Sequence, residues 1–112
     1  MSTPEGRVKA KVKQWLNEHG CWYYMPSQNG MGRSGIPDFI CCFPWLNGRL
    51  VAIETKAPGK QSNTTHNQDR ELRSINKAGG VAIVIDDVRQ LEETFPPLIR
   101  ALNALDTGGE FK

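Results

Sequence analysis

The sequence predicts a single α/β domain whose elements follow the order helix, strand, strand, strand, helix, strand, with a mixed central sheet and short helices at the C-terminal end. A helical apolar stripe near the N-terminus, three strand-like runs and a continuous apolar run after a second helical segment predict this order. A chain of 112 residues, 38% of them hydrophobic, suits one core rather than two. We place the core at about residues 3–90, a C-terminal helical extension at about 91–106 and a frayed tail at 107–112.

The first helix is predicted by a start signal, an apolar stripe and a stop signal. Thr3 can cap the helix, and Pro4 suits its first position. One face of the helix is formed by the apolar residues Val8, Val12, Trp15 and Leu16. Gly20 ends the helix after about His19.

Three strands are predicted next, separated by a glycine-rich loop and a turn. Residues 21–25 are aromatic-rich and are followed by Pro26, which indicates a short strand. Its aromatics, Trp22, Tyr23 and Tyr24, are suited to base stacking, although we favour core packing as their role. A loop rich in glycine then leads to residues 36–43 and 49–56, which read as the two strands of a β-hairpin.

The second half of the chain begins with a second helix, at about residues 64–78. Leu72 and Ile75 face inward from this helix, and two glycines at 79–80 end it. The continuous apolar run 81–85 is typical of a buried strand. Asp87 can cap a short helix that follows.

Charge and composition narrow the class of function. Residues 1–77 contain eleven Lys and Arg against six Asp and Glu, a net charge of +5, whereas residues 78–112 contain three against six, a net charge of −3. This asymmetry favours a nucleic-acid partner, with a merely solvated basic face as the alternative. No apolar run approaches the about 20 residues of a membrane helix, and no glycine-rich phosphate loop predicts a nucleotide cofactor. The absence of a signal-like N-terminus and the odd number of cysteines predict the cytoplasm, that of a bacterial host if the protein is phage-encoded.

Polar side chains occupy five positions where the pattern calls for apolar ones. Asp38 lies at the start of one hairpin strand, and Glu54 and Lys56 lie at the end of the other. Glu5 and Gln68 head the apolar stripes of the two helices. Glu54 and Lys56 share a strand face about 7 Å apart, and Asp38 can lie about 5 Å across from them. Clustered carboxylates repel one another unless a cation separates them, so we expect a magnesium or manganese ion.

The proposed cluster sets a condition on the hairpin register. A two-residue turn at Asn47–Gly48 would pair residues whose numbers sum to 95, which puts Asp38 on the opposite sheet face from Glu54. A sum of 92 instead places Asp38 opposite Glu54 and leaves a five-residue loop at 44–48. The site therefore requires the even register.

Three of these residues also have a plainer interpretation. Glu5 can complete a capping box with Ser2 or act as a helix-dipole partner, and Glu54 and Lys56 can form a solvated strand face. A single metal site explains all of the residues together, so we favour it. A zinc site is not predicted, because the histidines and cysteines lack ligand spacing: His19, Cys21, Cys41, Cys42 and His66.

Pro37-Asp38, fifteen further residues and then Glu54-Thr55-Lys56 resemble the PD-(D/E)xK nuclease signature, and the element order is similar to that superfamily's restriction-endonuclease-like core. With Glu5 and Gln68 in register, residues 3–90 resemble the VRR-NUC domain in its stand-alone, virus or phage-type form. The resemblance implies Asp38 and Glu54 as metal ligands with the backbone carbonyl of Thr55, and Glu5 as a further acidic group. It also implies Lys56 as the catalytic lysine and Gln68 as a positioning residue. The pair Asp86-Asp87 departs from the family's pattern after the last strand.

These features together predict a metal-dependent endonuclease that hydrolyses phosphodiester bonds in DNA and serves repair or replication. Basic and polar residues around the centre are expected to contact DNA without reading its sequence: Arg7, Lys9, Lys11, Lys13, Arg33, Ser34, Lys60, Arg70 and Arg73. The resemblance further implies a homodimer that resolves branched DNA such as four-way (Holliday) junctions. The aromatic strand and a C-terminal stripe formed by Leu98, Leu102 and Leu105 offer surface for its interface, although we favour covering of the protein's own core as the role of each. A monomeric flap or single-strand nickase, and a non-catalytic DNA-binding module, remain alternatives.

Overall fold

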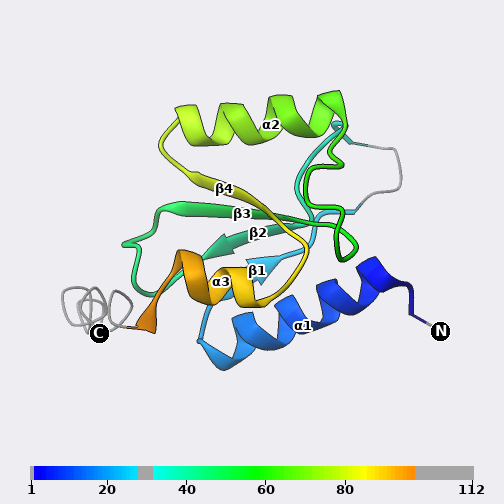
Figure 1. Ribbon diagram of the computed structural model, residues 1–112. Helices are drawn as coiled ribbons and strands as arrows, with labels where there is room; N and C mark the ends of the chain where they lie inside the picture. Colours follow the sequence, from blue (N-terminus) through cyan, green and yellow to red (C-terminus); the bar gives the residue numbers. More distant parts are fainter. Residues whose placement is uncertain (1, 28–31, 98–112) are drawn as a thin grey trace.

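The computed structural model describes residues 2–27 and 32–97, which form three layers with a sheet between helices (Figure 1). The helices are α1 (Pro4–Glu18), α2 (His66–Lys77) and α3 (Arg89–Thr94). The strands are β1 (Trp22–Tyr24), β2 (Phe39–Cys42), β3 (Leu50–Thr55) and β4 (Val81–Ile85). Helix α2 lies over one face of the sheet, and α1 and α3 lie over the other. The predicted mixed α/β fold is confirmed.

The four strands lie in the order β1-β2-β3-β4, antiparallel except for the parallel pair β3 and β4. In the hairpin, Phe39 pairs with Ile53 and Cys42 with Leu50, so the paired numbers sum to 92. The predicted even register is therefore confirmed. Continued by one residue, it brings Asp38 alongside Glu54.

Several elements are shorter than the sequence predicts. Strand β2 begins at Phe39 rather than at residue 36, since Pro37 has no N–H to give to the ladder. Helix α2 begins at His66, because Thr65 caps it and accepts from the backbone N–H of Gln68. In the described part of the chain no helix has the length and apolar character needed to cross a bilayer. The tail and residues 98–106 of the expected helical extension, with the stripe of Leu98, Leu102 and Leu105, lie outside the described residues.

Two apolar clusters hold the layers together, one on each face of the sheet. The larger joins α1 and α3 to the sheet through side chains such as Leu16, Phe39 and Leu91. The smaller consists of Ala52, Leu72 and Ala82, between α2 and the strands β3 and β4. Because α2 packs over the β3–β4 side of the sheet, the part of this face that belongs to β1 has no helix over it among the described residues.

This uncovered part of the sheet carries aromatic side chains. Trp22 is 62% exposed and Tyr24 is 55% exposed, whereas Tyr23 faces the core and packs near Phe39. Trp22, Cys42 and Leu50 form one exposed row across three strands. The expectation that all three aromatics pack in the core is thus wrong for Trp22 and Tyr24, because strand alternation turns them away from α1.

Gly35 brings the loop before β2 into contact with the start of α2. Its φ is +86°, and a Cβ there would lie 2.5 Å from the backbone carbonyl of Asn67 and 2.9 Å from the N of Gln68. The Gly35→Ala variant should therefore push α2 away from the sheet and lower the melting temperature. The matched control is Gly48→Ala, which has similar strain at φ +81° but open space around it. Equal thermal shifts in the two variants would show that the close approach of Gly35 is unimportant.

Candidate active site

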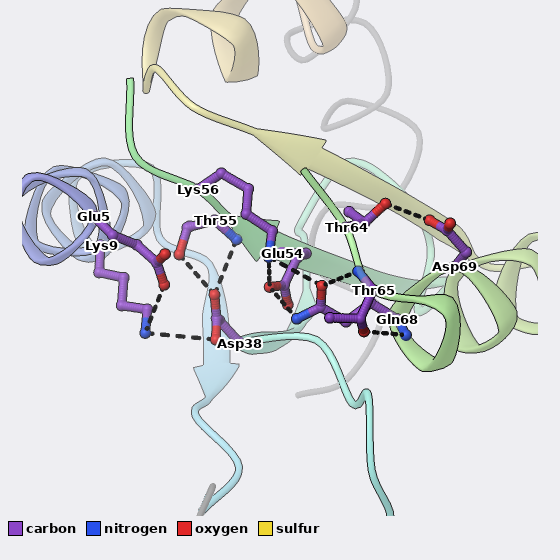
Figure 2. A network of polar contacts seen from close by, with 10 residues as sticks. All are labelled: Glu5, Lys9, Asp38, Glu54, Thr55, Lys56, Thr64, Thr65, Gln68 and Asp69. Carbon is purple, nitrogen blue, oxygen red and sulfur yellow. Dashed lines mark hydrogen bonds and ion pairs between the residues drawn. The ribbon is translucent and has the colours of Figure 1, made fainter. Parts of the chain in front are cut away.

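Polar side chains from four elements meet at the end of β3 (Figure 2). Glu54, Thr55 and Lys56 come from β3 and the residue after it, and Asp38 directly precedes β2. Gln68 reaches the cluster from the first turn of α2, and Glu5 and Lys9 extend from the first turns of α1. The structure thus brings together all five of the predicted central residues.

Asp38 is held in one orientation by Thr55. Its Oδ2 accepts a hydrogen bond from the backbone N of Thr55 at 2.9 Å and another from the Thr55 hydroxyl at 2.6 Å. Asp38 is 9% exposed and Thr55 is fully buried. Two donors on one oxygen fix the carboxylate and leave Oδ1 directed toward Lys9.

Glu54 is a buried carboxylate with one oxygen that lacks a partner. It is 3% exposed, and its Oε2 accepts from Gln68 Nε2 at 3.0 Å and lies 3.4 Å from Lys56 Nζ. Its Oε1 is buried and accepts no hydrogen bond from any described residue. The pKa of Glu54 is raised from 4.5 to about 7, mainly by burial and next by the charge of Asp38, while Lys56 partly offsets both.

Gln68 joins the start of α2 to the end of β3. Its Oε1 accepts from Lys56 Nζ at 2.9 Å and from the backbone N of Thr65 at 3.0 Å, while its Nε2 donates to Glu54. The bond to Thr65 completes a capping box, so the same side chain stabilises the helix and orients the site. Lys56 is only 11% exposed and is therefore fixed between Glu54 and Gln68.

Glu5 and Lys9 form the α1 side of the site. Lys9 Nζ lies 3.5 Å from Glu5 Oε2 and 3.6 Å from Asp38 Oδ1. Glu5 makes no capping box with Ser2, since the cap of α1 is Thr3. Lys9, expected as a DNA contact, is paired with two carboxylates.

The other expected DNA contacts are divided among different surfaces. Arg7 and Lys11 line a pocket together with Asp86 and Asp87. The two aspartates after the last strand therefore lie near basic residues of α1. Three more of the expected contacts are exposed on the surface: Lys13, Lys60 and Arg73. The other two make polar contacts. Ser34 Oγ accepts a hydrogen bond from Asn67 at 3.0 Å, and the Arg70 guanidinium lies 3.7 Å from the Glu71 carboxylate.

Arg33 is tied to α2 by an ion pair. Its Nε donates to Glu71 Oε2 at 2.7 Å, and Glu71 is 4% exposed. Glu71 was not predicted to have a role, although a glutamate directly before the inward-facing Leu72 is a signal of partial burial. The hydroxyl of Thr55 and the position of Lys9 were likewise not predicted. The spacing of Lys9, one turn beyond Glu5, was the available signal.

The donor set fits a hard divalent cation. Within residues 2–27 and 32–97, no three carboxylate, imidazole or thiol side chains converge as a metal-binding group. Asp38 and Glu54 supply two carboxylates, and Glu54 Oε1 is a buried acceptor that lacks a donor. Carboxylate and carbonyl oxygens are the ligands that magnesium and manganese prefer. The arrangement can therefore hold such an ion if a backbone carbonyl or water completes its coordination.

Comparison with known proteins yields one structural similarity. A solved structure described as a VRR_NUC domain is 28% identical in sequence, with a TM-score of 0.67. The match covers 86% of this chain and 98% of that one. No family model matches the chain, and no curated protein is significantly similar to it. The resemblance to the VRR-NUC domain predicted from the sequence is confirmed by this match.

Proposed function

We propose that this chain, which shares its fold with a VRR-NUC domain, is a nuclease that hydrolyses phosphodiester bonds in DNA with a bound magnesium or manganese ion. The observation that carries the proposal is the buried Glu54 Oε1, which has no donor, beside the fixed carboxylate of Asp38. Leaving a buried carboxylate oxygen unpaired is costly unless a ligand satisfies it.

The protein groups divide the work at this centre. Asp38 and Glu54, with the Thr55 carbonyl, would hold the cation, which when bound polarises a phosphodiester and lowers the pKa of a water. The Lys56 ammonium stabilises negative charge that develops on the phosphoryl oxygens. Gln68 acts as a positioning residue, because it holds Lys56 and Glu54 through one amide group.

The test is nicking of a labelled DNA duplex, junction and flap by the intact protein. We expect cleavage with magnesium or manganese and none in excess EDTA. The Asp38→Asn variant should lose cleavage, and Asp69→Asn, a change of the same type on α2, should retain it. Binding of DNA without cleavage in any divalent ion would establish the alternative, a non-catalytic DNA-binding module.

DNA is expected to contact the exposed lysines and arginines near the centre through its phosphates. The affinity for duplex, measured by fluorescence anisotropy in EDTA, should therefore fall steeply as salt rises. Lys60→Ala, four residues beyond Lys56, should reduce the salt slope by about 1. The control is Lys77→Ala at the far end of α2, which should leave the slope unchanged. An affinity insensitive to salt would contradict phosphate contacts.

We further propose that the active species is a homodimer that prefers branched DNA. A single centre cuts one strand, and a two-fold pair would present two centres to a junction. The exposed row of Trp22, Cys42 and Leu50, with Tyr24 beside it, supports self-association because large apolar side chains seldom gather on a free surface.

Sedimentation of the Trp22→Glu variant tests this assembly. At micromolar concentration we expect the wild-type protein to sediment as a dimer and Trp22→Glu as a monomer with weakened junction preference. Asn17→Glu, exposed on α1, should remain dimeric. A wild-type monomer that cuts linear duplex as readily as a junction would refute the resolvase proposal and favour a nickase, while leaving the metal chemistry intact.

A further inference from the structure

Lys9 lies where a cation would lie between two carboxylates. Its ammonium is 3.5 Å from Glu5 Oε2 and 3.6 Å from Asp38 Oδ1 (Figure 2). An ordinary helix-surface pair would involve Glu5 alone, one turn earlier on α1. Here the ammonium also reaches Asp38, whose side chain is only 10% exposed and comes from a different element. This contact makes Lys9 part of the site.

The partners of the carboxylate oxygens separate the site into two sides. On the α1 side, Asp38 Oδ1 already faces the ammonium of Lys9. On the α2 side, Glu54 Oε2 faces Gln68 and Lys56, and Glu54 Oε1 has no donor among the described residues. The carboxylate oxygen that lacks a donor therefore belongs to Glu54, on the side of Asp38 away from Lys9.

The net charge of the five side chains at the site favours one bound divalent cation. When all five groups are ionised, Glu5, Asp38 and Glu54 carry three negative charges, and Lys9 and Lys56 carry two positive ones. One bound divalent cation changes this net negative charge of one into a net positive charge of one. A second would add two more positive charges next to the Lys9 ammonium, which like-charge repulsion opposes.

We propose that Lys9 is a built-in counter-ion that takes the place of a second divalent cation between Glu5 and Asp38, so that the centre binds one divalent cation. This inference rests on the proposed metal-dependent function. Glu5 then serves as the partner of Lys9 rather than as a metal ligand. Removal of the ammonium should open a second cation site between the two carboxylates.

The test is the number of manganese ions bound per chain, measured by electron paramagnetic resonance as free manganese is titrated into the millimolar range. We expect one ion for the wild-type protein and two for Lys9→Gln. Lys13→Gln, the next lysine along the same helix face, is the matched control and should bind one ion. Lys9→Arg, which retains the positive charge, should also bind one.

The double variant Glu5→Gln/Lys9→Gln locates the second ion. It should return to one ion, since Glu5 can no longer contribute a charged oxygen. Two ions in the wild-type protein, or one ion in Lys9→Gln, would overturn the role of Lys9 while leaving the metal-dependent function standing. No bound manganese in the wild-type protein would instead overturn the proposed function itself.

Discussion

Replacement of Glu54 by Gln is expected to reduce cleavage by about a thousandfold or more and, without divalent cations, to stabilise the protein increasingly as pH rises. The loss of cleavage corresponds to about 4 kcal/mol of transition-state stabilisation and is expected because the variant removes one of the two carboxylates proposed to hold the cation. The gain in stability follows from the pKa of Glu54, which is raised from 4.5 in the unfolded chain to about 7 in the folded one.

The sign of the pH effect follows from proton binding. Between pH 4.5 and about 7 the folded protein holds a proton on Glu54 that the unfolded chain has released, so the wild-type free energy of unfolding falls through this window. Above it the wild type bears a penalty of about 3 kcal/mol that Glu54→Gln lacks. The difference in unfolding free energy between variant and wild type should therefore grow by about that amount between pH 4 and 8.

Urea denaturation in EDTA at several pH values measures this difference. The glutamine amide can itself change the unfolding free energy, because its NH₂ can take the place of the unpaired Oε1. This cost does not depend on pH, so it cancels when the stability differences at the two pH extremes are compared. Glu18→Gln, an exposed change on α1, is the control for the loss of one charge. If the stability difference between Glu54→Gln and wild type stayed constant with pH, the raised pKa would be wrong.

Replacement of Lys56 by Met is expected to reduce cleavage by about a hundredfold to a thousandfold while leaving manganese binding intact. The ammonium is 11% exposed and lies between Glu54 and Gln68, where it can act on phosphoryl charge in a partly water-excluded setting. Methionine keeps most of the side-chain length and removes the charge.

Single-turnover nicking, paired with manganese titration, separates the two roles of Lys56. Lys13→Met, exposed on α1, is the control for the same change at a remote position. Loss of manganese binding in Lys56→Met would show that the lysine supports the ligands rather than the reaction. Cleavage within about tenfold of wild type would contradict a direct catalytic role.

Most of the site could be predicted because its determinants are local or depend on strand parity. Thr3-Pro4 marks the start of the first helix, and Thr65 caps the second. A site shared by Asp38 and Glu54 requires an even register of the hairpin, and the observed sum of 92 meets that requirement. The position of Gln68 follows from helical spacing. These rules place residues on faces and at element ends, which is where the polar cluster forms.

The remaining features depend on how the layers cover one another. Trp22 and Tyr24 are exposed because α2 packs over the β3–β4 side of the sheet, which no local pattern specifies. Lys9 meets Asp38, and Arg33 meets Glu71, through contacts between elements distant in sequence. Long basic side chains reach several neighbours, so their partners are decided by tertiary packing.

The position of the proposed metal ion can be measured in a crystal of the wild-type protein grown with manganese. Anomalous diffraction locates the metal independently of any activity. We expect an anomalous peak from a manganese ion coordinated by Asp38 and by Glu54 through the Oε1 that lacks a donor. A manganese-saturated crystal with no peak at these two carboxylates would contradict it.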